Sequence, residues 1–253
     1  MASTTTADAL CKVPEVTVIF WVIKILATTL GETGGDAVSM SLNLGYLVST
    51  GIFALVFVAA VSFQMMSKKF HPVTYWVTIV ATTTVGTTLA DFADRSLGIG
   101  YSGGTAILLS FLLLSLFIWY RSMGSVSITT INSAKSEAFY WVTIMFSQTL
   151  GTALGDWVAD TDGLGYEASI LIFGGILALT ALAYYKTKIS HVVLFWTAFI
   201  LTRPLGAVVG DFLDKPISQG GLALNRYSAT ATIISMMVIL LFVYRQKPAL
   251  NTH

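Results

Sequence analysis

The chain has 253 residues, of which 55% are hydrophobic and 11% are charged, and its formal net charge is +1. Soluble domains carry about 25% charged residues, so this composition does not fit a soluble protein, and the small net charge gives no indication of nucleic-acid binding. The single cysteine, Cys11, excludes an intrachain disulfide and a cysteine metal cluster. Together these values predict a polytopic membrane protein.

Eight apolar stretches follow one another along the chain. Each is close to the ~20 residues that an α-helix needs to cross a bilayer, so we expect an all-α protein with eight transmembrane helices. The stretches lie near residues 14–36, 44–66, 73–93, 104–121, 138–158, 167–185, 192–212 and 228–244. The N-terminus lacks the pattern of a cleaved secretion signal and is interpreted as a short polar tail.

A spaced triplet occurs four times: a Trp is followed ten residues later by Gly and fifteen residues later by Asp. The four series are Trp21, Gly31, Asp36; Trp76, Gly86, Asp91; Trp141, Gly151, Asp156; and Trp196, Gly206, Asp211. Self-similarity of this kind indicates tandem repeats, here four hairpins of two spans each. Because every hairpin has an even number of spans, all four enter the membrane in the same direction. This predicts pseudo-symmetry about an axis along the membrane normal rather than inverted repeats.

The repeats alternate, because residues 120 positions apart match more closely than neighbouring repeats do. Lys68 matches Lys188, His71 matches His191, and the DFAD that starts at Asp91 matches the DFLD that starts at Asp211. The chain therefore divides into two halves of two hairpins. The predicted organisation is a tail (1–12), a first half (13–120), a linker (121–137), a second half (138–245) and a tail (246–253).

Basic residues predict the orientation of the helices. One side of the membrane would carry Lys12, Lys68, Lys69, Arg121, Lys135, Lys186, Lys188, Arg245 and Lys247, whereas the opposite turns carry only Arg95, Lys215 and Arg226. The positive-inside rule then places both termini in the cytoplasm and the acidic turns outside.

Four tandem two-helix repeats, each with a Trp near the start of its first helix, resemble a bacterial inner-membrane protein family that is catalogued as a repeat of unknown function. The resemblance covers residues 13–245 and implies a location in the bacterial inner membrane. The fourth repeat departs from the others. Its Tyr227 lies 31 residues after Trp196, whereas the first three repeats place Tyr46, Tyr101 and Tyr166 only 25 residues after their Trp.

The four repeat Asp residues share one depth if the four Trp residues form a belt at the cytoplasmic interface, because fifteen helical residues rise roughly 22 Å. Acids inside spans often mark ion or proton paths, and carboxylate oxygens suit Mn²⁺, Mg²⁺ or Ca²⁺. The candidate metal ligands are Glu32, Asp36, Asp91, Asp156 and Asp211. The alternative is that each Asp ends its helix and faces water, which is the expectation for Asp94, Asp160, Asp162 and Asp214.

Helical spacing adds candidate pathway residues, because positions 8, 11 and 15 after each Trp lie on one face. Besides Glu32 at position 11 of the first repeat, they are Thr29, Thr84, Thr87, Thr149 and Thr152, whereas the fourth repeat has Pro204 and Ala207 at positions 8 and 11. A Thr in a helix can instead bond to its own backbone. Arg203 is expected to pair with Glu32 or with a repeat Asp.

Two other features have structural interpretations. The small residues around Gly31, Gly86, Gly151 and Gly206 form small-xxx-small pairs, which let helices approach closely in lipid. We therefore expect the first helices of the repeats to pack around a centre. Lys24 is expected to extend toward the cytoplasmic interface.

No enzyme signature, nucleotide-binding motif or cofactor motif is present, so the expectation is a protein that is not an enzyme and needs no cofactor. The favoured function is secondary transport of a small cation, with a divalent metal such as Mn²⁺ first and proton exchange as the driving force. The expected partners are the lipid bilayer and a small cation or proton, with a homo-oligomer also allowed. Two alternatives stay open: a non-transporting assembly or sensor module whose acids cap helices, and a cation channel with a continuous polar lumen.

Overall fold

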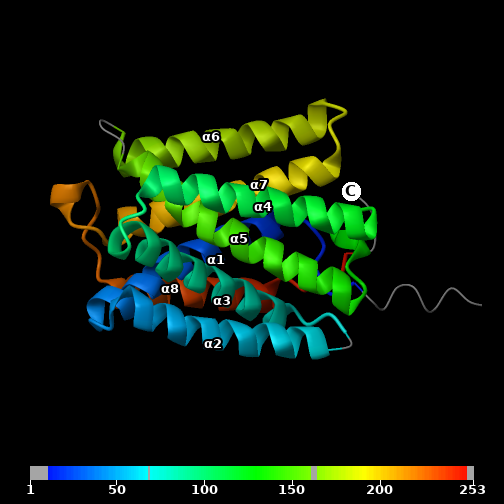
Figure 1. The fold of residues 1–253 in the computed structure, drawn as a ribbon, viewed down its shortest axis with the longest axis horizontal. Coiled ribbons are helices and arrows are strands. Elements are labelled where there is room, and N and C mark those ends of the chain that lie inside the picture. The colour runs from blue at the N-terminus through cyan, green and yellow to red at the C-terminus, as the bar shows by residue number, and fades with distance from the viewer. Residues whose placement is uncertain (1–10, 68, 161–163, 250–253) are drawn as a thin grey trace, which may run out of the picture.

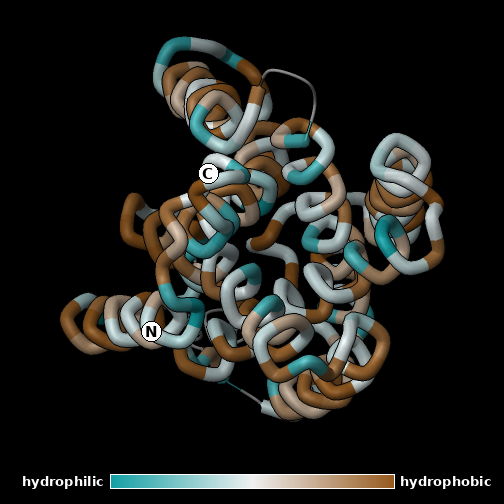
Figure 2. The backbone as a smooth tube through the Cα atoms, turned by 90° about the vertical axis from the view of Figure 1, so that its left-hand side faces the viewer, coloured by the Kyte–Doolittle hydropathy of each residue, from teal (hydrophilic) through white to brown (hydrophobic). Residues whose placement is uncertain are grey.

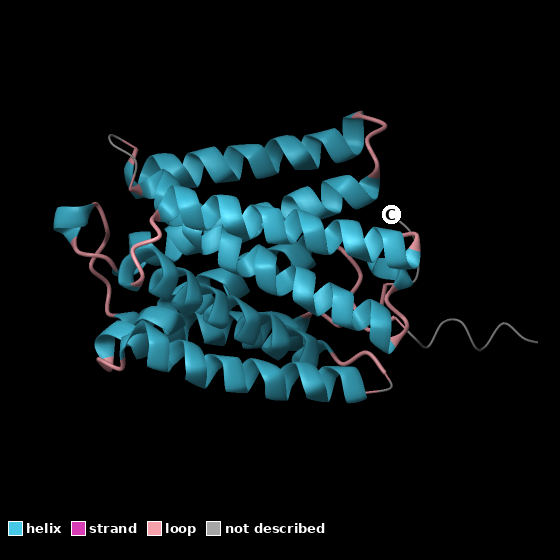
Figure 3. Cartoon of the chain, in the orientation of Figure 1, coloured by secondary structure: helices cyan, strands magenta, loops and turns pink. Residues whose placement is uncertain are grey.

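The structure is a computed structural model that describes residues 11–67, 69–160 and 164–249. In these ranges the chain is helical, with an isolated bridge but no strand (Figure 3). The eight α-helices are α1 (Val18–Asp36), α2 (Gly45–Met66), α3 (Pro72–Asp91), α4 (Tyr101–Met123), α5 (Ala134–Ala159), α6 (Gly165–Lys186), α7 (His191–Asp214) and α8 (Arg226–Val243). The predicted all-α fold with four tandem two-helix repeats is confirmed.

Local sequence signals explain several helix ends. The Thr17 side chain accepts a hydrogen bond from the backbone N–H of Phe20 and so caps α1. Ser133 and Ser136 cap α5 reciprocally, and Pro72 occupies the first turn of α3, where its missing N–H is not needed. Helix α4 ends at Gly124, whose φ of 75° lies in the left-handed region that glycine adopts at little cost.

The first helices of the four repeats form an inner ring in which α1 contacts α3, α3 contacts α5, α5 contacts α7 and α7 contacts α1. The second helices lie outside this ring and are spaced around it when the bundle is seen end-on (Figures 1 and 2). Each of them packs mainly on the first helix of the following repeat: α2 on α3, α4 on α5, α6 on α7, and α8 on α1. The packing of α8 on α1 closes the ring.

The repeat glycines lie at the contacts between inner helices. Gly31 faces Thr83, Gly86 faces the backbone at Gln148, Gly151 faces Arg203, and Gly206 faces Thr28. In each case the opposing residue belongs to the next inner helix around the ring. The expectation that these glycines pack the first helices together is therefore met, and each glycine makes room for a residue seven positions after a repeat Trp.

The outer helices present large apolar side chains on the surface, including Leu55 (74% exposed), Leu171 (76%) and Phe242 (86%). Within the described part of the chain, six helices are long and apolar enough to cross a membrane: α1 with its π-helical turn Ala37–Ser41, α2, α4, α6, α7 and α8. Eight spans were expected, and α3 and α5 are not among the six. Both are inner helices that the outer helices shield, so their Thr, Ser and Gln side chains lie inside the bundle.

The repeat Trp residues do not form an interfacial belt. Trp76, Trp141 and Trp196 are only 1%, 4% and 5% exposed, so the expectation for them was wrong. Together with the aromatic residues that precede them, the four Trp residues pack into an aromatic plug at one end of the inner helices. The plug consists of Phe20, Trp21, Tyr75, Trp76, Tyr140, Trp141, Phe195 and Trp196.

Polar atoms of the plug find partners within the protein, which explains why these rings turn inward. The hydroxyl groups of Tyr75 and Tyr140 lie 2.6 Å apart. The indole N–H of Trp76 donates to the Gln246 side chain at 2.9 Å, and that of Trp196 donates to the Val126 carbonyl at 2.9 Å.

The segments at both ends of the chain pair with each other beside the plug. The N–H of Glu15 donates to the Lys247 carbonyl and the N–H of Ala249 donates to the Val13 carbonyl, both at 2.9 Å. Cys11 is buried against the carbonyl of Ile128, which lies in the connection between α4 and α5. Residues 11–12 and 246–249 of the expected tails, and Ile128 of the expected linker, thus lie at this end of the bundle.

The reactivity of Cys11 tests this terminal pairing. Burial raises the pKa of its thiol, and the thiolate is the reactive form, so we expect slow alkylation whose rate keeps rising with pH above the ordinary thiol pKa. Deleting residues 246–253 removes the two backbone hydrogen bonds and should accelerate maleimide modification roughly tenfold or more, since each bond contributes about 1 kcal/mol. Equal rates for the full-length and shortened chains would contradict the pairing.

Candidate cation site

The four repeat Asp residues lie at the ends of the inner helices, at the opposite end of the bundle from the aromatic plug. Asp36, Asp91, Asp156 and Asp211 are 1%, 3%, 4% and 3% exposed. They are therefore not the water-facing helix ends of the alternative interpretation.

Two basic residues join the four Asp residues into two pairs. The Lys215 ammonium lies 2.7 Å from Asp36 and 3.0 Å from Asp211. The Arg95 guanidinium lies 2.8 Å from Asp91 and 3.2 Å from Asp156. Each basic residue bridges the Asp of its own repeat to the Asp of the next inner helix, so the four carboxylates meet in pairs and not as one group.

Arg95 and Lys215 were expected only as basic residues of the outer turns. The signal that identifies them is the 120-residue offset, because each directly follows the last Asp of DFAD or DFLD. The two bridges differ in burial: the Arg95 side chain is 32% exposed and that of Lys215 is 8% exposed. Burial alone lowers the pKa of an ammonium, but Asp211 and Asp36 raise the pKa of Lys215 above its ordinary value, so it carries its charge.

Deeper in the bundle, Arg203 forms the expected ion pair with Glu32, at 3.0 Å. Its guanidinium is fully buried and also donates to Thr87 at 2.6 Å and to Thr152. The Thr87 hydroxyl in turn lies 3.3 Å from the Glu32 carboxylate. One side chain from each inner helix therefore contributes to this contact.

The predicted threonine stripe divides into two groups. Thr29, Thr84 and Thr149 each donate to a carbonyl four residues earlier in their own helix, so their hydroxyl groups satisfy local backbone. Thr87 and Thr152 accept hydrogen bonds from Arg203, and Thr87 also contacts the Thr83 carbonyl of its own helix. The structure thus brings two of the five predicted pathway threonines to the central ion pair.

Asp214 is 8% exposed and pairs with Arg226 at 2.7 Å, so the expectation that it faces water was wrong. The longer turn of the fourth repeat places Arg226 at the start of α8, where it also lies 3.8 Å from Asp36. Asp94 is half-buried and Asp160 is exposed. Asp162 lies outside the described residues.

Lys24 does not reach an interface. It is fully buried, and its ammonium lies 4.3 Å from the centre of the Phe199 ring, so the expectation for it was wrong. Because α7 covers this face of α1, the long side chain has no route to the surface, and the aromatic ring provides a cation–π contact instead.

In this half of the bundle, six buried carboxylates form ion pairs with only four cationic side chains. The formal excess is two negative charges. The carboxylates are Glu32, Asp36, Asp91, Asp156, Asp211 and Asp214, and the cationic groups are Arg95, Arg203, Lys215 and Arg226. An excess of buried negative charge favours uptake of a cation or of protons.

Three of these carboxylates are close enough to share one metal ion. Glu32, Asp36 and Asp211 each offer an oxygen within 4.8 Å of the others, and all three are buried. The Oδ1 atom of Asp36 has no hydrogen-bond partner among the described residues. This group, the α1–α7 carboxylates, offers hard oxygen ligands. Asp91 and Asp156 lie outside it.

A polar cavity of about 230 Å³ lies at the end of the bundle opposite the aromatic plug. Both bridging residues, Arg95 and Lys215, line it, as do Asp160, Tyr166 and Gln219. The cavity therefore leads from the turns to the groups that hold the two Asp pairs.

The repeat sequence also decides which family the chain belongs to. A family model described as Repeat of Unknown Function (DUF347) matches residues 19–70, 74–125, 139–190 and 194–247. The chain belongs to this family. Each matched segment contains one inner helix of the ring and the outer helix that follows it, so the family repeat coincides with the hairpin. No curated protein and no solved structure matches the chain.

Proposed function

We propose that this protein spans the bacterial inner membrane and transports a small cation, with a divalent metal such as Mn²⁺ as the first candidate and protons as the counter-ion. The observation that carries the proposal is the buried excess of negative charge at this site, where the three α1–α7 carboxylates pair with only two cationic side chains, Arg203 and Lys215. Intramembrane acids are costly and commonly mark ion paths.

Membrane embedding is supported by the surface of the outer helices. Hydrophobic residues run along them (Figure 2), and side chains such as Leu55 and Phe242 are largely exposed. A monomer in water rarely exposes apolar surface on this scale. Basic residues lie in the last turn of α4 and at or just beyond the ends of α2, α6 and α8; this plug end is the cytoplasmic end under the positive-inside rule.

Lys215 gives the proposal a mechanism. Its ammonium occupies the space between Asp36 and Asp211, where it serves as a tethered counter-ion. A lysine is a compact charge on a flexible stem, whereas the guanidinium of an arginine is held by its planar geometry. An entering metal ion would displace Lys215 toward the polar cavity and take its place among the three carboxylates, and protons would replace the metal ion when it leaves.

Mn²⁺ uptake by the purified protein in liposomes tests this mechanism, because two variants are expected to change transport in opposite directions. Asp36→Asn removes a ligand and should reduce Mn²⁺ uptake tenfold or more. Lys215→Met removes the competing charge and should raise the apparent affinity for Mn²⁺ about tenfold, which corresponds to ~1.4 kcal/mol. A pH-sensitive dye inside the liposomes should report proton movement in the opposite direction to the metal ion.

Glu167→Gln is the matched control, because this acid in the first turn of α6 is exposed, lies outside the ion pairs and does not line the polar cavity. The same variants, with Asp156→Asn added, should be compared in cells that lack the protein, by metal content and metal sensitivity. Full activity of Asp36→Asn and Asp156→Asn across metals and pH would make the acids structural.

Two other functions make different predictions. A non-transporting assembly or sensor module is favoured by the ion pairs themselves, because each of the four repeat Asp residues already contacts Lys215 or Arg95; it predicts no uptake for any variant. A cation channel needs a continuous polar lumen. The aromatic plug closes the bundle between the inner helices in this conformation, so a channel would have to move these rings aside.

A further inference from the structure

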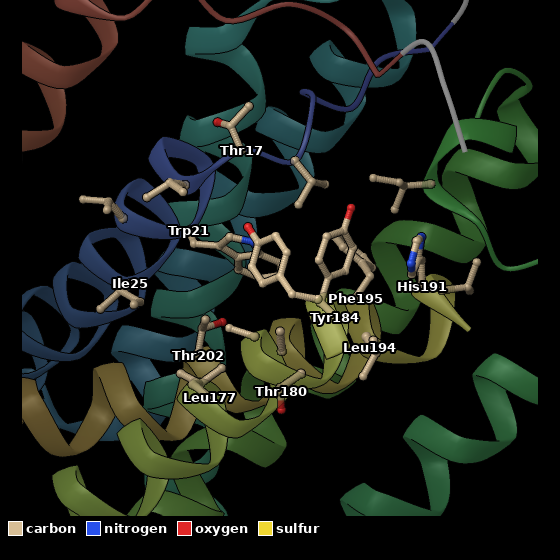
Figure 4. Close-up of a pocket in the computed structure, with 18 of the residues that line it drawn as sticks. Thr17, Trp21, Ile25, Leu177, Thr180, Tyr184, His191, Leu194, Phe195 and Thr202 are labelled. Carbon is tan, nitrogen blue, oxygen red and sulfur yellow. The ribbon is translucent and has the colours of Figure 1, made fainter. Parts of the chain in front are cut away.

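A groove of about 530 Å³ lies on the side of the bundle, between the start of α1, the last turns of α6 and the first half of α7 (Figure 4). Its inner walls are apolar and include Trp21, Ile25, Leu177, Leu194 and Phe195. It is separate from the α1–α7 carboxylates, which lie toward the other end of the inner helices. The groove is therefore a second candidate binding site.

The equivalent space beside α4 is filled. Trp119 on α4 and Tyr184 on α6 both lie 43 residues after the Trp of their repeats. Trp119 is fully buried and packs edge-on against Trp196, with ring centres 5.8 Å apart. Tyr184 is half-buried and lies beside His191 at 4.6 Å instead. The groove is open because the α6 position holds the smaller ring, turned toward the end of the helix.

One end of the groove is polar and basic. Thr17 and His191, which begin α1 and α7, line this end, and Figure 4 shows both away from the deeper residues Leu177 and Thr202. Lys186 is the last residue of α6 and Lys188 lies in the connection from α6 to α7, and both are exposed. Glu15 is the acid next to the lining segment of α1. The two lysines near this end of the groove outnumber the single acid, so this end of the groove favours an anionic group.

We propose that this groove binds an anionic phospholipid, with one acyl chain between α1, α6 and α7 and the phosphate group near Lys186, Lys188 and His191. The apolar body and the basic end match the two parts of such a lipid. The site is open to the side of the bundle, where a lipid would enter from the leaflet at the plug end. This inference depends on the membrane embedding proposed above but not on cation transport.

Trp21 provides a probe, because it lines the groove. The protein would be placed in phosphatidylcholine nanodiscs that contain a small fraction of phosphatidylglycerol with brominated acyl chains, which quench nearby Trp fluorescence. The contribution of Trp21 is the difference between the unmodified protein and Trp21→Phe. We expect this contribution to be quenched at lower fractions of brominated phosphatidylglycerol than of brominated phosphatidylcholine.

Two variants address the two ends of the site. Ala198→Phe places a ring inside the groove and should abolish the preferential quenching. The double variant Lys186→Gln with Lys188→Gln should weaken the preference for phosphatidylglycerol roughly tenfold, given the contribution of each lysine near an anionic surface. Lys69→Gln is the matched control, because this exposed lysine lies in the connection between α2 and α3 and should change nothing.

Equal quenching by the two brominated lipids, or quenching that Ala198→Phe leaves unchanged, would overturn the lipid site. Carbonate extraction of native membranes measures separately whether the protein is embedded in the membrane. It therefore distinguishes a protein that is not embedded from an embedded protein that lacks the lipid site. If the unmodified protein transported no metal ion but still preferred phosphatidylglycerol, only the transport proposal would be refuted.

Discussion

Replacing Arg203 with methionine is expected to lower the free energy of unfolding by about 3–5 kcal/mol. The guanidinium is fully buried and pairs with Glu32 at 3.0 Å, so its removal leaves a buried carboxylate without its cationic partner. Thr87 and Thr152 lose the same donor. Equilibrium denaturation of the purified protein in mixed micelles measures the change.

The double variant Glu32→Met with Arg203→Met is the control that identifies the cause. Removing both charges eliminates the unpaired carboxylate, and buried ion pairs can often be exchanged for apolar residues at little cost. We therefore expect the double variant to recover most of the lost stability while losing the proposed cation site. If the single and double variants were equally unstable, the loss would come from packing around Arg203 and not from the charge of Glu32.

Replacing Gly86 with alanine is expected to cost about 1–3 kcal/mol of stability through overpacking. A Cβ atom at Gly86 would lie 2.9 Å from backbone atoms of both Gln148 and Thr149 on α5. Because backbone atoms cannot move aside as a flexible side chain can, α3 and α5 would have to separate. The same denaturation measurement applies.

Gly51→Ala provides the matched comparison, because Gly51 lies within α2 and a Cβ there meets nothing within 4 Å. Alanine is preferred to glycine inside a helix by roughly 0.5–1 kcal/mol, so this variant should be slightly stabilised. The two substitutions are chemically identical, and opposite signs would show that the inner-helix contact decides the outcome. A neutral effect at Gly86 would mean that α3 and α5 can repack.

Spacing along the chain was sufficient to predict the four hairpins, the inner helices and the packing role of the glycines, because each depends on periodicity within one helix. The pairing of Glu32 with Arg203 was also predicted, because a deeply placed arginine needs a carboxylate and few are available. These features follow from residue type and depth alone.

Features that depend on the neighbours of a helix could not be predicted in the same way. Each outer helix covers the inner helix of the following repeat, and this arrangement buries Trp76 and Trp196, which the sequence pattern would place at an interface. Lys24 is enclosed for a related reason, since α7 covers its face of α1. The two bridges made by Arg95 and Lys215 required the knowledge that α3 adjoins α5 and that α7 adjoins α1.

The packing of α8 on α1 and the two backbone hydrogen bonds between residues 13–15 and 247–249 bring the end of the fourth repeat back to the start of the first. An open solenoid can lengthen by adding repeats at its ends, but here every inner helix already has two inner neighbours and one outer cover. The number of repeats is therefore limited by geometry to those that complete the circle. The two termini therefore meet at one junction of a closed ring. The packing depends on which repeats are neighbours around the ring, and it depends less on which repeat comes first in the chain.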